Sequence, residues 1–104
     1  MIYDLYGLKK GDVEVLYLEL NKIVPVSPVG RISDHYGEYY SYDLNTGEKI
    51  CILLNWFIDD ENHRVLYKEF QVLIKIEETQ RPQYWEALLK EIFPEIELLE
   101  REEY

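Results

Sequence analysis

The sequence predicts an α+β fold, in which two helices pack on a mostly antiparallel sheet. Residues 50–58 form a nearly continuous apolar run rich in isoleucine and aromatic residues, which is typical of a strand buried on both faces. Residues 13–24 and 85–92 instead place apolar side chains at helical spacing. Asn45-Thr46-Gly47 joins the apolar run to a tyrosine-rich stretch at 32–44, which indicates an antiparallel hairpin.

The N-terminal part of the chain predicts a strand followed by a helix. Residues 2–6 alternate loosely between apolar and polar and predict a short strand, which a turn at 7–11 closes. Asp12 suits the N-cap of the first helix. This helix is expected to end near Ile23, because Pro25 disfavours helical geometry in the residue before it.

The middle of the chain predicts two paired strands. Residues 25–31 contain two prolines and a glycine and are expected to form a connection. Residues 32–44 are expected to form one strand, with Tyr40, Tyr42 and Leu44 on one face and Tyr39, Ser41 and Asp43 on the other. In the central strand, Asn55 is the one side chain that requires a hydrogen-bond partner or access to solvent.

The next strand is expected to be half-buried. Residues 59–68 are polar and predict an exposed loop. The strand after it carries one apolar face, and Leu73 interrupts the polar face. The predicted apolar face consists of Phe70, Val72, Ile74 and Ile76.

The C-terminal part predicts a second helix and a last strand. This helix is expected to begin at Thr79 or Gln80, with Pro82 in its first turn, and to stop before Pro94. Residues 96–99 predict a short strand, and residues 100–104 a charged tail with frayed structure. The nearby acids Glu95, Glu97 and Glu100 are most simply solvent-facing.

These elements follow the order β-α-β-β-β-α-β within a single domain of residues 1–104. Two helices with apolar stripes on one sheet are typical of the split β-α-β arrangement, of which we expect a ferredoxin-like variant. The sequence does not fix the order of the strands.

Charge is the most informative bulk property. The chain carries 21 Asp and Glu against 11 Lys and Arg, a net charge of −10. Direct binding of nucleic acid is therefore disfavoured, whereas a basic protein partner is favoured; the alternative is that the acidity only keeps the chain soluble. No apolar leader or membrane-spanning run is evident, which predicts a cytoplasmic protein that does not bind membranes. Cys51 is expected to be a small buried hydrophobic residue.

No motif predicts catalysis, a cofactor or a metal site. The sequence lacks a phosphate-binding glycine loop, a zinc-binding His-Glu-x-x-His and a Gly-x-Ser-x-Gly. Asp34 and His35 are adjacent, and neighbours on a strand point to opposite faces, which disfavours a catalytic pair. The acidic run from Asp59 to His63 lacks the spacing of a calcium loop and is better explained as a solvated turn.

The tyrosines of residues 36–42 suit a protein interface, because tyrosine combines apolar area with a hydrogen-bonding tip. One tyrosine face is expected to pack under a helix. The other, close to Glu38 and Asp43, is expected to face a basic partner. The alternative is that all four tyrosines pack in the core.

Four stretches together resemble a group of small acidic immunity proteins that are encoded beside bacterial toxins, including those of contact-dependent growth-inhibition systems. These stretches are residues 3–8, 37–42, 70–76 and 96–102. The resemblance implies a non-catalytic cytoplasmic protein that binds one toxin domain, often a nuclease with a basic cleft, and blocks its active site. We expect the toxin-binding surface to include Glu38, Tyr39, Asp43, Asp59, Asp60 and Glu61.

Two other classes of function stay open. The first is a small-molecule-sensing or homo-oligomerising regulatory domain, which predicts a pocket between helix and sheet and a dimer that depends on concentration. The second is an enzyme that uses His35 or His63. If the chain is an immunity protein, we expect the free protein to be a monomer or a weak dimer.

Overall fold

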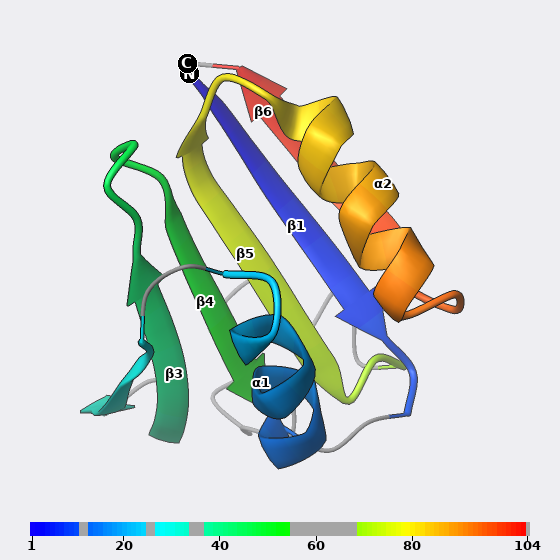
Figure 1. Cartoon of the computed structure of the whole chain (residues 1–104). Coiled ribbons are helices and arrows are strands. Elements are labelled where there is room, and N and C mark those ends of the chain that lie inside the picture. The colour runs from blue at the N-terminus through cyan, green and yellow to red at the C-terminus, as the bar shows by residue number, and fades with distance from the viewer. Residues whose placement is uncertain (11–12, 25–26, 34–36, 55–68, 104) are drawn as a thin grey trace.

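The computed structural model describes residues 1–10, 13–24, 27–33, 37–54 and 69–103. Among these residues, six strands form one antiparallel sheet in the order β2-β3-β4-β5-β1-β6, and two helices cover the same face of it (Figure 1). The α+β class is therefore confirmed. In chain order the elements are β1 (Ile2–Leu8), α1 (Val13–Asn21), β2 (Val29–Ser33), β3 (Gly37–Asp43), β4 (Lys49–Leu54), β5 (Val72–Thr79), α2 (Pro82–Ile92) and β6 (Glu97–Glu103).

The sheet contains one strand more than the sequence predicted. Residues 25–31 and 32–44 were expected to form a connection and a single strand, and both predictions are wrong. Instead, β2 begins at Val29 and pairs with β3 as a hairpin, with Ser33 opposite Gly37. The prolines upstream did not exclude this strand, because β2 lies at the edge of the sheet and a proline just ahead of an edge strand removes no interior hydrogen bond. β5 lies between β1 and β4; the ferredoxin-like variant stays a prediction.

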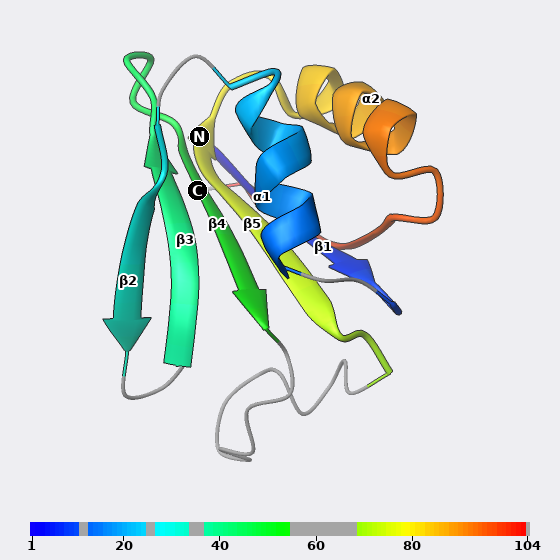
Figure 2. The ribbon, with the colours of Figure 1, turned by 60° about the horizontal axis from the view of Figure 1, so that its bottom comes forward.

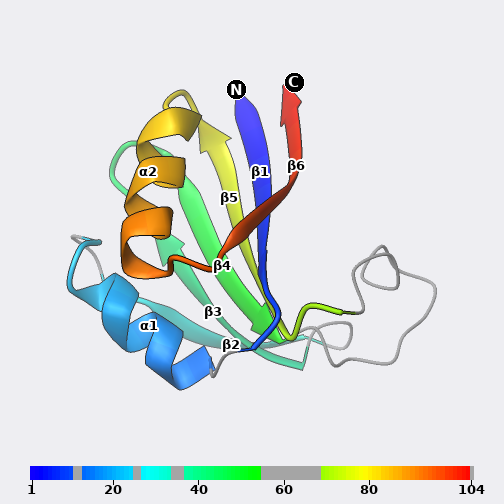
Figure 3. The same cartoon turned by 90° about the vertical axis from the view of Figure 1, so that its right-hand side faces the viewer.

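The main core lies between the sheet and the two helices. Leu16 and Leu20 of α1 and Trp85 and Leu89 of α2 pack against apolar side chains of the sheet, and all four are at most 3% exposed. Both predicted helical stripes are therefore confirmed. Figures 2 and 3 show the two helices side by side on one face, with α1 over the middle of the sheet and α2 over the β1 side. The strand residues of this core are Tyr6, Leu8, Tyr42, Ile50, Ile52, Val72, Ile74 and Ile76.

The opposite face of the sheet carries a second apolar cluster, which consists of Leu5, Cys51, Leu53, Phe70 and Leu73. Phe70 was expected to share a face with Val72, and that prediction is wrong. Phe70 precedes β5, and it packs with Leu73 on the side away from the helices. Leu73 is therefore an apolar anchor of this second face. Cys51 is buried as expected, and its burial raises the pKa of the thiol.

Both ends of the chain extend further into the sheet than predicted. β1 continues through Gly7 to Leu8, because Leu8 is buried and pairs with β5; the turn expected to begin at Gly7 is wrong. β6 continues to Glu103 and pairs with β1 along its length, so the expected frayed tail is also wrong. Gly47, by contrast, takes a φ of +94°, as the predicted turn requires. The predictions for Asp12, Asn55 and the loop at 59–68 lie outside the described residues.

Candidate functional site

The predicted toxin-binding residues fall partly within the described structure. Tyr39 and Asp43 lie on β3, on the face away from the helices and with Ser41 between them. Tyr39 is half-buried against the second cluster, and Asp43 is exposed, with Lys49 as its partner in the register. Glu38 belongs to the same strand. The other three predicted residues and both histidines lie outside the described residues; these are Asp59, Asp60, Glu61, His35 and His63.

The helix-facing tyrosines of β3 contribute to packing. The ring of Tyr40 stacks on that of Tyr17 in α1, with centroids 4.5 Å apart and an angle of 8° between the planes. Tyr42 is fully buried, and its hydroxyl lies 3.2 Å from the carbonyl oxygen of Tyr17 and 3.0 Å from Oδ1 of Asn21. Burial raises the pKa of Tyr42 to about 12. The prediction that one tyrosine face packs under a helix is confirmed.

A buried carboxylate joins the β3–β4 turn to the start of α2. Glu48 is 3% exposed, and its Oε1 lies 2.8 Å from both Nη2 of Arg81 and Oγ1 of Thr46. Its Oε2 accepts hydrogen bonds from Nε1 of Trp85, at 2.8 Å, and from the hydroxyl of Thr79. Burial by itself raises the pKa of Glu48, but these hydrogen bonds outweigh burial and lower the pKa to about 2. Both carboxylate oxygens are therefore saturated.

Thr79 or Gln80 was expected to begin the second helix, and this prediction is wrong. Thr79 ends β5, and its hydroxyl oxygen accepts a hydrogen bond from the backbone N–H of Arg81 while it donates to Glu48. The helix begins at Pro82 with Arg81 as N-cap. Thr79 therefore contributes to the Glu48 cluster rather than to a helix cap.

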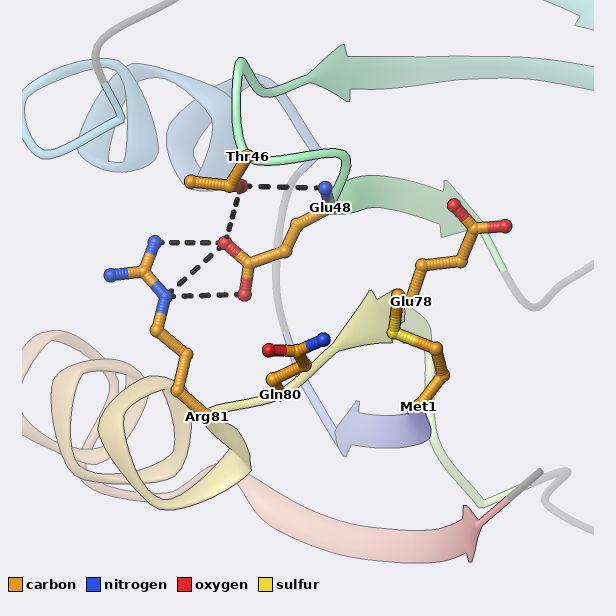
Figure 4. Close-up of a pocket in the computed structure, with 6 residues that line it drawn as sticks. All are labelled: Met1, Thr46, Glu48, Glu78, Gln80 and Arg81. Carbon is orange, nitrogen blue, oxygen red and sulfur yellow. Dashed lines mark hydrogen bonds and ion pairs between the residues drawn. The ribbon is translucent and has the colours of Figure 1, made fainter.

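A pocket of about 410 Å³ opens beside Glu48. Figure 4 shows Arg81 and Thr46 on one side of it, Glu78 and Met1 on the other, and Gln80 between them. The guanidinium of Arg81 also lies over the ring of Tyr84, 4.5 Å from its centroid. Glu78 adopts a φ of +59°, in the left-handed region that is unfavourable for residues other than glycine.

A second buried carboxylate lies under α2. Asp4 is fully buried in β1, and Arg101 of β6 contacts both of its oxygens. Tyr6 donates a further hydrogen bond to Asp4 at 2.9 Å, and Nη2 of Arg101 also lies 3.0 Å from Oε1 of Glu86 in α2. The hydrogen bond to Asp4 raises the pKa of Arg101. This cluster fastens the edge strand to the sheet and to α2.

Because Arg101 turns inward, the outer surface of β6 is strongly acidic. Residues 95–103 contain five glutamates and a single basic residue, Arg101. Nζ of Lys9 lies 4.0 Å from Glu97, and both side chains are more than half exposed, so this pair contributes little neutralisation. We call this surface the acidic edge, and it consists of Glu95, Glu97, Glu100, Glu102 and Glu103.

The sequence contained part of the signal for the acidic edge. The density of glutamate was visible in the sequence. A charged C-terminal tail and a charged edge strand have the same composition, however, and only the pairing of Arg101 with buried Asp4 distinguishes them. Arg101, Glu48 and Arg81 were missed for the same reason. Their partners are far away in the chain, at separations of 97 residues for Asp4–Arg101 and 33 for Glu48–Arg81.

No family model, curated protein or solved structure matches this chain. Within the described residues, no group of three or more His, Cys, Asp or Glu side chains is placed to hold a metal ion. No helix among them is long and apolar enough to cross a membrane. The arrangement is an open antiparallel sheet with an acidic edge strand, held from inside by buried ion pairs.

Proposed function

We propose that this protein is a non-catalytic immunity protein of the bacterial cytoplasm, which binds a cognate toxin domain and neutralises it by covering the active site. The partner is a basic domain, and a nuclease fits best because its cleft must attract a polyanion. The observation that carries the proposal is the acidic edge: four glutamates in an edge strand and a fifth just before it, where the only arginine of the strand pairs with buried Asp4.

The acidic edge suits the attraction of a basic partner for two reasons. It follows β6, which lies at one edge of the sheet (Figure 3), so the glutamates of the strand share that edge. Among the described residues, the two buried acids, Asp4 and Glu48, each pair with their own arginine, so these arginines do not neutralise the acidic edge. Like charges gathered in this way raise the rate of encounter with a basic surface and select against acidic partners.

The predicted residues of β3 and of the loop predicted at 59–68 give a second location for the contact. Tyr39 and Asp43 lie on β3, near the other end of the sheet, and β4, β5 and β1 separate this strand from β6 and the acidic edge. Glu38, Asp59, Asp60 and Glu61 belong to the same proposed surface. We favour the acidic edge, because Lys49 is the register partner of Asp43 and offsets its charge.

The test is the association rate with the toxin-like domain encoded beside this gene, measured by stopped flow at two salt concentrations. The double variant Glu102→Gln, Glu103→Gln is expected to associate severalfold more slowly, with a flatter salt dependence. Asp43→Asn, which removes one charge from β3, is the control for location, and we expect its association rate to equal that of the wild type. A lower association rate for Asp43→Asn alone would show that the contact lies on β3. A wild-type protein that neither binds nor inhibits the domain would refute the immunity function.

The pocket beside Glu48 supports a second candidate function, that of a small-molecule-sensing domain. Its volume suits a small polar ligand, and Glu78 adopts a strained conformation at its wall. This function predicts that metabolite mixtures raise the melting temperature of the protein and that Gln80→Ala abolishes the rise. A melting temperature that no metabolite changes, together with tight toxin binding, would exclude it.

A further inference from the structure

A groove separates the start of α1 from the end of α2. It measures about 460 Å³, and most of its lining side chains are apolar. Leu8, at the end of β1, and Leu16 are buried beneath it, while Ile92 and Phe93 are partly exposed in its wall. Its other lining residues are Lys10, Val15, Pro94 and Glu95. A recess of this size and composition accepts one large apolar side chain.

The apolar surface continues from this groove along α1. Val15 and Leu18 are each 54% exposed, and they lie three residues apart, on one side of the helix. Leu16 and Leu20 are buried beneath them. A helix that is apolar on its outer as well as its inner side is typical of one that is covered in its functional state.

The charges around the groove select its occupant. Glu95 lines the groove and is also the first residue of the acidic edge, so the two surfaces are continuous. Glu14 and Glu91 are exposed on the two helices that form the groove, so that with Glu95 these acids outnumber Lys10, the basic residue of its lining. A second copy of this chain, itself at −10, would bring further negative charge to this rim. The complementary occupant is an apolar side chain set among lysines and arginines.

We propose that the groove and the Val15–Leu18 surface form the apolar centre of the toxin contact, with the acidic edge as its charged rim. This inference rests on the proposed immunity function and adds to it the location of the contact and the chemistry of the partner: a large apolar side chain of the toxin domain, flanked by basic residues. Buried apolar anchors supply most of the affinity of such contacts, and the charged rim supplies encounter rate and specificity.

The experiment is titration calorimetry of the same toxin-like domain against Val15→Gln and Leu18→Gln variants. Both side chains are exposed and glutamine is a good helix former, so the melting temperature should stay that of the wild type. We expect the Kd to rise about tenfold or more for each variant. The matched control is Val29→Gln on the edge strand β2, where Val29 is 48% exposed, and its Kd should change less than about twofold.

The outcomes separate this inference from the function on which it rests. Tight wild-type binding that both α1 variants retain would overturn the apolar centre and leave the immunity function standing. A Kd that rises equally in the Val29→Gln control would also overturn it, because the effect would not be local to the groove. Absence of binding by the wild type would remove the proposed function and this inference with it.

Discussion

Arg101 and Asp4 form a two-point ion pair across the first and last strands of the sheet. Nε of Arg101 lies 2.8 Å from Oδ1 of Asp4, and Nη2 lies 2.9 Å from Oδ2. The carboxylate is fully buried, whereas the arginine side chain is 30% exposed. The strand that gives the molecule its acidic edge is therefore held in place by the one basic residue it contains.

Removal of this arginine is expected to destabilise the fold strongly. In Arg101→Ala, Asp4 keeps its burial and loses its cation, which should lower the free energy of unfolding by about 3 kcal/mol. Urea denaturation measures the change. The control is Lys22→Ala, which removes an exposed pair with Glu19 and should cost about 0.5 kcal/mol or less. Equal losses in the two variants would contradict a structural role for the buried pair.

Glu48 is expected to make stability depend on pH. Its pKa in the folded protein, about 2, lies below the ordinary value of 4.5, so its contribution is fully present above pH 4.5 and is lost as the pH falls toward 2. Glu48→Gln has no proton to gain there. Urea midpoints at pH 5 and pH 3 should therefore fall further for the wild type than for this variant. Equal decreases would mean that Glu48 is not held by its hydrogen bonds in solution.

Gly7 is expected to tolerate no side chain. A Cβ at this position would lie 2.8 Å from Cδ1 of both Leu99 and Phe70, so Gly7→Ala should cost about 1–3 kcal/mol of unfolding free energy. Gly30→Ala is the control, because the nearest atom to its Cβ is 3.9 Å away, in Tyr40. Addition of Leu99→Ala should recover part of the loss. If the two glycine variants unfold at the same temperature, the close contact at Gly7 is refuted.

Replacement of Glu78 by glycine is expected to stabilise the fold. Its φ of +59° is unfavourable for a residue with a side chain, so Glu78→Gly should raise the free energy of unfolding by up to about 1 kcal/mol. Glu77→Gly, at a regular strand position, should lower it by about 0.5–1 kcal/mol. Thermal denaturation compares them. A melting temperature below that of the wild type for Glu78→Gly would show that the side-chain contacts of Glu78 outweigh the strain.

The fold was predictable where the spacing of apolar residues in the sequence indicates which side chains are buried. The stripe of Trp85 and Leu89 and the continuous run of β4 each identified an element and its buried face correctly. The hairpin of β2 and β3 was not predictable in this way, because a proline-rich connection and an edge strand share a composition. Phe70 was assigned to the wrong face because the alternation of β5 was extended to residues that precede its first residue, Val72.

The candidate site was less predictable than the fold. Tyr39 and Asp43 were correctly placed on one face, since alternation along a strand decides this. The inward orientation of Arg101 depends on a pairing of β1 with β6 that local sequence does not encode. The groove depends on where α1 and α2 meet, and no local pattern singled out Val15 as part of it. Such features follow from tertiary arrangement, which is invisible to local pattern.

The ion pair between Asp4 and Arg101 also sets how late in synthesis the buried carboxylate of Asp4 gains its cation. The ribosome adds roughly 5–20 residues per second, so Asp4 is added to the chain on the order of 5–20 s before Arg101. A chain that stops before Arg101 has most of its strands and an unmatched charge in its interior. Such chains should unfold readily and be degraded.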